Sequence, residues 1–193
     1  MKIFRLTFLL VLPLLLVSSA MAQNQTFTVD PAASQVGFTV GGSHVVKGTF
    51  HVQSGAIDFD PGAGKIDGFV VVATGSGNSG EASRDKKMSG QVLDAPHFAE
   101  TTFVPHSYTG TIAGSGDSTI QVSGTFTLHG TGHEIIVPMQ IHIEGGNCTA
   151  KGQFQVPYVD WGMKAPSMPF FHVDKIVGID LTLVGTVARA KGK

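Results

Sequence analysis

The sequence predicts an all-β protein of antiparallel strands with one short helix inserted mid-chain. Apolar residues recur at every second position over most of the length, which is the period of a strand with one buried face. Few helical patterns separate the alternating stretches, which favours antiparallel pairing of roughly eight to ten strands. The turn signals between the first stretches are Asp30-Pro31, Gly41-Gly42, Ser54-Gly55 and Asp60-Pro61-Gly62.

Alternation marks strands on both sides of the helix. Before it, the alternating residues are Val36, Phe38 and Val40, then Val46, Phe50 and Val52, then Ile57 and Phe59. Residues 66–74 include a continuous apolar run, as expected of a strand covered on both faces. After the helix, the alternating stretches are residues 101–108, 119–128, 135–143, 150–156 and 176–188. This pattern is compatible with a sandwich and with a closed barrel of about eight strands, whose interior can be filled or can hold one ligand.

One of these pairs has the pattern of a hairpin. Residues 119–128 and 135–143 face each other across His129-Gly130-Thr131-Gly132-His133. In the second arm, one face carries Ile135, Val137, Met139, Ile141 and Ile143. The pleat therefore predicts that these five side chains point to the interior.

The predicted helix lies in residues 75–103, where charge is dense. We expect it to run from about Gly80 to Ser89. Asn78 or Ser79 can cap its start, Glu81 suits the positive end of the helix, and Gly90 can end it.

The first 22 residues have the pattern of a cleaved signal peptide. Lys2 and Arg5 precede an apolar run over residues 8–17, and Ala20-Met21-Ala22 offers a small-x-small cleavage site. The run is short for a membrane span, so no stable membrane anchor is expected. The mature domain would be residues 23–193, exported to the bacterial periplasm or beyond the cell.

Charge and cysteine content narrow the function class. The expected mature chain keeps 11 basic and 14 acidic residues, a formal charge of −3, and its only basic cluster is Lys86-Lys87. Nucleic acid is therefore not an expected partner. Cys148 is the only cysteine, so no internal disulfide is possible and the core must stabilise the fold.

Residues 157–174, the 157–174 segment, break the alternation and yet are rich in aromatic residues and methionine. They include Tyr158, Trp161, Met163, Met168, Phe170 and Phe171. Either this segment packs over the barrel as a plug, or it lines the mouth of a cavity with adaptable side chains.

The sequence carries no recognised catalytic motif. It contains no G-x-S-x-G, P-loop or H-E-x-x-H pattern. Residues 75–80 match the spacing G-x-G-x-x-G, and we interpret Gly75-Ser76-Gly77 as a turn signal. His129 and His133 flank a turn and offer two of the three or four ligands that zinc needs, and nothing in the sequence supplies a third. We therefore expect no catalytic residues and no metal site.

Arg84 and Asp85 are the candidate polar contacts of a ligand. A guanidinium offers planar donors that could orient a head group at an apolar pocket. The alternative is a helix-surface pair with little effect, and the residues alone leave both interpretations open. Lys86 and Lys87 are expected on a solvated helix face.

Taken together, several short motifs resemble one known family in their order and spacing. They are Thr28-Val29-Asp30-Pro31, Ser34-x-Val36-x-Phe38, Val46-x-Gly48-x-Phe50, Gly55-x-Ile57-x-Phe59-Asp60, Arg84-Asp85, Thr102-Phe103, Val122-x-Gly124-x-Phe126-Thr127-Leu128-His129-Gly130 and Val137-Pro138. From Phe27 to about Val187 the chain resembles the YceI-like, polyisoprenoid-binding family of lipocalin-like exported proteins. The resemblance implies an antiparallel β-barrel that holds a long isoprenoid chain, such as a quinone or a polyprenyl lipid, and performs no reaction. Where that family usually has Arg-Asp-x-His-Leu, this chain has Arg84-Asp85-Lys86-Lys87-Met88.

These observations combine into one prediction of function, an exported carrier of an isoprenoid lipid with no other cofactor. The expected wall residues are Phe38, Phe50, Phe103, Phe126, Phe154 and Trp161. Met88, Met163 and Phe170 are expected at the rim, and Arg84 or Asp85 near the head group. One rival is an enzyme that modifies a lipid in the same cavity. The other is an interaction protein with a filled barrel, whose 157–174 segment contacts a partner or forms a homodimer.

Overall fold

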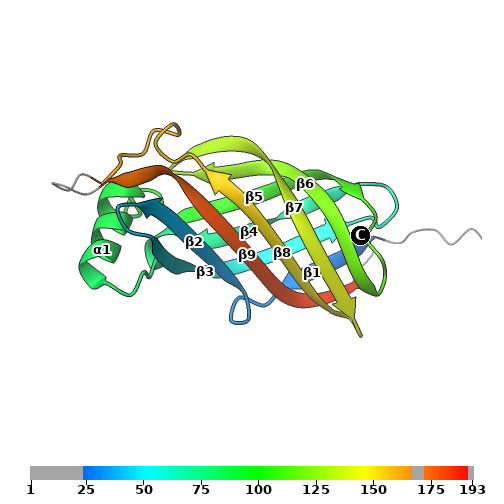
Figure 1. The fold of residues 1–193 in the computed structure, drawn as a ribbon. Coiled ribbons are helices and arrows are strands. Elements are labelled where there is room, and N and C mark those ends of the chain that lie inside the picture. Colours follow the sequence, from blue (N-terminus) through cyan, green and yellow to red (C-terminus); the bar gives the residue numbers. More distant parts are fainter. Residues whose placement is uncertain (1–23, 167–171, 191–193) are drawn as a thin grey trace, which may run out of the picture.

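The computed structural model describes residues 24–166 and 172–190 and consists almost entirely of strands (Figure 1). The strands are β1 (Gln25–Val29), β2 (Gln35–Gly42), β3 (Val46–Phe59), β4 (Ile66–Ala73), β5 (Glu100–Gly110), β6 (Gly116–Leu128), β7 (Thr131–Glu144), β8 (Asn147–Val156) and β9 (Val173–Arg189). Between β4 and β5 lie the 3-10 turn η1 (Thr74–Ser76), the helix α1 (Ala82–Lys87) and the π-helical turn η2 (Met88–Val92).

The strands close into a single antiparallel barrel. Each strand pairs with its neighbour in the order β3-β2-β9-β8-β7-β6-β5-β4, and β4 pairs back with β3. Every pairing is antiparallel. The all-β prediction is confirmed, and closure excludes the sandwich.

Nine strands fill only eight positions around the barrel, because β1 and β2 share one position. Both strands pair with β3 on one side and with β9 on the other. The chain leaves the sheet over residues 30–34, where the Asp30 carboxylate accepts a hydrogen bond from the Ala32 N–H at 2.9 Å. At the gap the Val184 N–H donates to Ser34 Oγ at 2.9 Å, so a side chain replaces the missing ladder partner. The predicted number of about eight strands is confirmed.

The turn predicted at Ser54-Gly55 is wrong. β3 continues through it to Phe59, with a register shift between Val52 and Ser54 at the point where its partner strand changes. A Cβ atom at Gly55 would lie 2.8 Å from Val29 Cγ2. This glycine therefore allows a close approach to β1 inside a strand, just after the bulge at residues 52–54, and the sequence pattern alone presents it as a turn.

The β6–β7 hairpin has a shorter turn than residues 129–133. Its turn is His129-Gly130, with φ values of 53° and 75°, as in the two-residue turns that suit strand twist. The predicted inward face of β7 is confirmed, since Val137, Met139 and Ile143 are buried. Ile136, on the opposite face, is 62% exposed.

The helix is present, but its predicted cap and end are wrong. Glu81 caps α1, because its carboxylate accepts hydrogen bonds from the N–H groups of Ser83 and Arg84 at 3.0 and 2.9 Å. Asn78 is already paired with Thr49 through two backbone hydrogen bonds of 2.9 Å, so the helix starts later. Gly90 lies inside η2, which continues the helical path to Val92. In residues 24–166 and 172–190, no helix has the length and apolar character needed to cross a membrane.

Candidate functional site

The barrel encloses a cavity of about 850 Å³. This volume lies within the roughly 300–1,000 Å³ typical of small-molecule sites. All nine strands contribute to its wall. Its buried apolar lining residues include Phe27, Val36, Phe38, Phe59, Val70, Ile112, Ile120, Val122, Val137, Met139, Ile143, Cys148, Ala150 and Leu183.

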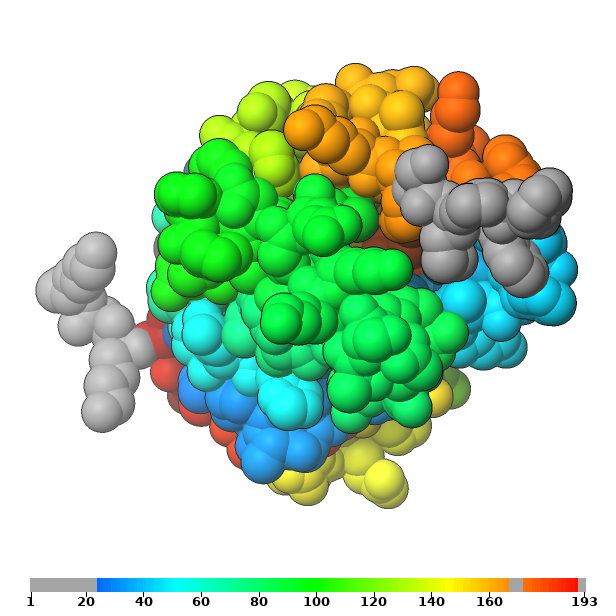
Figure 2. Space-filling model, turned by 90° about the vertical axis from the view of Figure 1, so that its left-hand side faces the viewer, coloured from blue at the N-terminus to red at the C-terminus, as the bar shows by residue number. Residues whose placement is uncertain are grey.

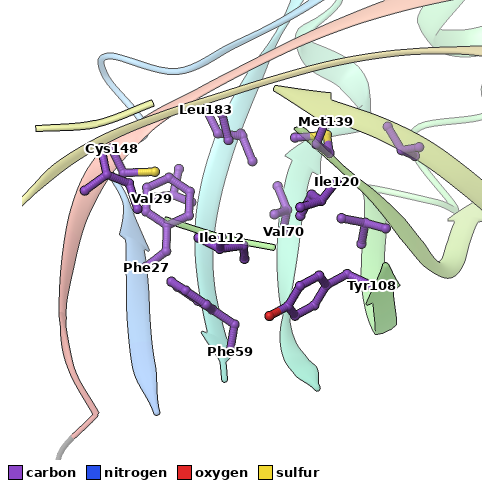
Figure 3. Packing of buried hydrophobic residues seen from close by; sticks show 14 of the residues in the cluster. Phe27, Val29, Phe59, Val70, Tyr108, Ile112, Ile120, Met139, Cys148 and Leu183 are labelled. Carbon is purple, nitrogen blue, oxygen red and sulfur yellow. The ribbon is translucent and has the colours of Figure 1, made fainter. Parts of the chain in front are cut away.

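The end of the cavity opposite α1 is apolar and is lined by large side chains. Phe27, Phe59 and Ile112 approach one another there from β1, β3 and the β5–β6 loop (Figure 3). Cys148, at the start of β8, belongs to the same cluster. Burial raises the pKa of its thiol from 9.0 to about 11, because the apolar surroundings disfavour the thiolate. At neutral pH, Cys148 is therefore one more apolar wall group.

The α1 end of the cavity, here called the mouth, is polar. It is lined by Ser43, His44, Ser79, Glu81, Ser83, Arg84, Lys87, Gln91, Lys164 and His172. Figure 2 views the molecule from this end and shows a recess between α1 and the chain that follows β8. A cavity that is apolar inside and polar at one end matches an elongated amphiphile with its tail inward and its head group at the mouth.

Arg84 and Asp85 have different positions at the mouth. Arg84 lines the cavity, and its Nε and Nη2 donate to Ser79 Oγ at 2.7 Å and to the Ser79 carbonyl oxygen at 2.9 Å. Asp85 does not line the cavity. Its carboxylate accepts hydrogen bonds from the Ser79 N–H at 2.9 Å and from the Ser79 hydroxyl. Asp85 thus holds Ser79, and Ser79 in turn holds the guanidinium of Arg84.

A pair of hydroxyls lies in the wall near the mouth. Thr74, which is 2% exposed, and Thr101 are hydrogen-bonded through their Oγ1 atoms at 3.0 Å, and both line the cavity. One O–H satisfies the other oxygen, which leaves one hydroxyl proton to donate elsewhere. Neither threonine is predictable as a site residue from the sequence, because threonine is common in strands. The only signal is that Thr74 ends an apolar run.

Of the nine predicted apolar site residues, six line the cavity, two described ones do not, and one is not described. Phe38, Phe50, Met88, Phe103, Phe126 and Phe154 line it. Trp161 stacks on His133 with ring centroids 3.8 Å apart, while Met163 is buried in a separate cluster with Tyr158. Phe170 lies outside the described residues. Ligand contact stays a prediction for every one of these residues.

The 157–174 segment combines the two roles expected of it. Tyr158 and Met163 pack against Leu128 and Val156 at the end of the barrel. Lys164, with its neighbours Ala165 and Pro166, lines the cavity. The part of this segment that the structure describes therefore both packs over the barrel and forms one side of the mouth.

The histidines do not form a metal site in the described part of the chain. No group of three or more His, Cys, Asp or Glu side chains is arranged to hold a metal ion there. His129 packs against Phe98 at 4.6 Å and His133 stacks on Trp161, so the two flanking histidines have separate aromatic partners. The two-ligand arrangement considered at this hairpin is therefore not observed.

Known proteins show the same fold and related sequences. The YceI-like domain matches residues 27–185. A UPF0312 protein of Pseudomonas syringae pv. tomato is 28% identical over 184 residues, 89% of this chain and 91% of the relative. A UPF0312 protein of Pseudomonas savastanoi pv. phaseolicola is 30% identical over 165 residues, 79% of this chain and 83% of the relative.

Two solved structures have the same barrel. Burkholderia cenocepacia BcnA has a TM-score of 0.67 at 22% identity, covering 82% of this chain and 99% of its own. A polyisoprenoid binding domain from Saccharophagus degradans, implicated in plant cell wall breakdown, has a TM-score of 0.63 at 15% identity. The match covers 84% of this chain and 98% of that domain's chain. At these identities the structures establish the fold. Since the matching domain spans most of the chain, the protein belongs to the YceI-like family.

Proposed function

We propose that the protein is an exported carrier that holds one elongated isoprenoid lipid of the quinone or polyprenyl type inside its barrel. The observation that carries the proposal is the apolar cavity of about 850 Å³ within a closed barrel. The name of the Saccharophagus degradans domain, a polyisoprenoid binding domain of the same fold, supports this class of ligand. The tail lies inward and the head group lies at the mouth.

Burial of the tail supplies most of the binding free energy. Each buried methylene contributes about 0.8 kcal/mol, and association costs at least about 4 kcal/mol, so a short tail gains little net affinity. The Thr74 and Thr101 hydroxyls and Arg84 lie near the mouth, where they can orient the head group. Orientation is thus set by a few polar groups and affinity by the wall.

Binding without reaction is the role that the cavity supports. Most histidine–carboxylate pairs, such as His106–Glu134 and His142–Asp117, involve exposed residues that do not line the cavity. His172, 3.2 Å from Asp174, is also exposed, at the mouth. General acid–base catalysis needs such a pair within reach of a reacting bond, and the deep wall consists of apolar side chains.

Native mass spectrometry of protein purified without detergent tests the proposal. We expect an adduct whose mass, after organic extraction, matches an isoprenoid series with steps of one isoprene unit. Protein stripped of lipid should regain an adduct when mixed with a quinone or a polyprenyl compound. Protein that emerges empty and cannot be reloaded with either compound would rule out the carrier role.

Export is tested separately from binding. The N-terminus of the protein recovered from the periplasmic or culture fraction should be Gln23, because Ala20-Met21-Ala22 precedes it. A protein that retains Met1 and stays with the cytoplasmic fraction would contradict export and leave lipid binding unaffected.

A further inference from the structure

We propose that the mouth selects isoprenoid lipids with an anionic head group, such as a phosphate, over lipids with the same tail and a neutral head group. This inference rests on the proposed carrier function and specifies the ligand of the same site. It is carried by the charges of the described residues that line the mouth, where Arg84, Lys87 and Lys164 stand against one carboxylate, Glu81.

The one acid at the mouth is already occupied. Glu81 caps α1, and its carboxylate accepts hydrogen bonds from the Ser83 hydroxyl at 2.9 Å and from two backbone N–H groups. These bonds lower the pKa of Glu81, so the group stays ionised and turned to the helix backbone. Glu81 also attracts Arg84, so the three cations and this one carboxylate leave a formal charge of +2 among the described lining residues.

The two other carboxylates close to these residues, Asp85 and Asp174, lie outside the cavity wall. Asp85 accepts both donors of Ser79 and does not line the cavity. His172 lies 3.2 Å from the Asp174 carboxylate, which does not line the cavity. In the described part of the chain, no carboxylate lies within 4.0 Å of the ammonium groups of Lys87 or Lys164. A head group inside the mouth thus adjoins cations from two chain segments and only one carboxylate, Glu81.

The guanidinium group of Arg84 is held in place at the mouth. Two of its nitrogens donate to Ser79, whose N–H and hydroxyl are held by Asp85. A guanidinium held in place loses less conformational entropy when it binds an oxyanion. Lys87 and Lys164 approach the mouth from α1 and from the chain after β8. An anionic oxygen at the mouth is therefore surrounded by cations on separate elements.

Lys86 and Lys87 form a matched pair for the test. Both are exposed and both lie at the end of α1, but only Lys87 lines the cavity. The substitutions Lys86→Glu and Lys87→Glu change the net charge of the protein equally. A second variant, Lys164→Glu, makes the same charge change on the other side of the mouth, away from the helix.

The experiment compares geranylgeranyl phosphate with geranylgeraniol, which has the same tail and a neutral hydroxyl. The Kd of each is measured on delipidated full-length mature protein by displacement of a fluorescent lipid. We expect the native protein to prefer the phosphate by about tenfold at low salt, the combined effect of three exposed cations. Lys87→Glu and Lys164→Glu should each reduce this preference by about threefold to tenfold, while Lys86→Glu should leave it nearly unchanged. Inorganic phosphate alone should not displace the lipid.

Salt dependence gives an independent readout. Raising the ionic strength from about 0.01 M to about 0.15 M shortens the Debye length from about 30 Å to about 8 Å. The Kd of the phosphate lipid should rise over this range and that of the alcohol should not.

Each outcome has a separate meaning. If neither lipid binds, the carrier function itself fails. If both lipids bind with equal Kd values, or if Lys86→Glu lowers the preference as much as Lys87→Glu, selection at the mouth is wrong and the carrier function stands. Loss of the preference in Lys87→Glu and Lys164→Glu alone supports the inference.

Discussion

A tryptophan at Val122 should block the cavity without unfolding the barrel. Val122 is 6% exposed, lines the cavity and is the middle residue of β6, between Tyr108 on β5 and Val137 on β7. The 13 residues of β6 span about 44 Å of strand, or about 34 Å along the axis at a tilt of about 40°. An indole at Val122 therefore stands about halfway between the two ends.

The effect on binding follows from the length of tail that is excluded. One isoprene unit has five carbons, and its burial is worth up to about 4 kcal/mol, which corresponds to a roughly 700-fold change in Kd. Val122→Trp should exclude at least one unit of a long tail and weaken binding accordingly. Gln121→Trp is the control, because Gln121 is exposed on the opposite face and pairs with the neighbouring residues Thr109 and Pro138.

Two measurements decide the result. Titration with a long polyprenyl alcohol gives the Kd, and thermal unfolding of lipid-free protein gives the Tm. An open cavity accepts the indole, so the Tm of Val122→Trp should stay close to that of Gln121→Trp. A filled interior would instead be overpacked, at a cost of about 1–3 kcal/mol. A large drop in Tm, or an unchanged Kd in a stable Val122→Trp protein, would refute the assignment of this interior as the lipid site.

Three further predictions use other features of the cavity. Cys148 should react with N-ethylmaleimide at pH 8 roughly a hundredfold more slowly than an exposed thiol, because its pKa is raised from 9.0 to about 11. Bound lipid should slow it further, and intact-mass kinetics that show no lipid protection would contradict its place in the wall. Burial also raises the pKa values of Tyr108 and Tyr158, so the folded state holds these protons more tightly than the unfolded chain. The stability contributed by Cys148 is fully present below pH 9 and is lost as the pH rises toward 11. The tyrosines act in the same direction, and an equal urea midpoint at pH 8 and pH 10.5 would contradict this. A free lipid concentration of about a thousand times Kd should raise the free energy of unfolding by about 4 kcal/mol, which is measured as a higher Tm. An unchanged Tm would argue against binding to the native state.

The strands were predictable because apolar and polar residues must alternate along a strand that has one buried face. The five apolar residues of β7 identify its inner face from sequence alone, and the structure buries Val137, Met139 and Ile143. The closure of the sheet was not predictable from period two, because alternation fixes which side chains share a face and is the same in a sandwich. Closure depends on the pairing of β9 with β1 and β2, which lie at the opposite end of the chain.

The errors arise where a residue type serves two purposes. Gly55 signals a turn by composition, and its actual reason is the close approach of Val29 inside a bulged strand. Asn78 is a good helix cap by residue type, but its backbone is bound to Thr49 and the cap falls to Glu81. In both cases a tertiary contact overrides a local preference.

At the site, the sequence identified apolar wall residues better than polar ones. Phe38, Phe103 and Phe126 lie on strands, where side chains point alternately to the two faces of the sheet, so the alternation of apolar residues identifies those that point inward. Arg84, Asp85 and the two lysines lie on a single short helix, where successive residues differ by about 100° in direction. Without the position of the barrel, nothing indicates that Arg84 and Lys87 face the mouth while Asp85 and Lys86 do not.

The size of the cavity also decides what fills it between ligands. A dry cavity costs about 24 cal/mol per Å³, so 850 Å³ would cost about 20 kcal/mol, more than the roughly 5–15 kcal/mol by which a whole domain is stable. The empty barrel must therefore admit water through its polar mouth. Entry of a tail then returns that water to bulk solvent and replaces it with apolar contacts along a wall built from nine strands. The antiparallel ladders join every strand of the wall without any group from the interior, so we expect the wall to stay in place in both states. We therefore expect the barrel to remain folded after it releases a lipid, as the proposed carrier function requires.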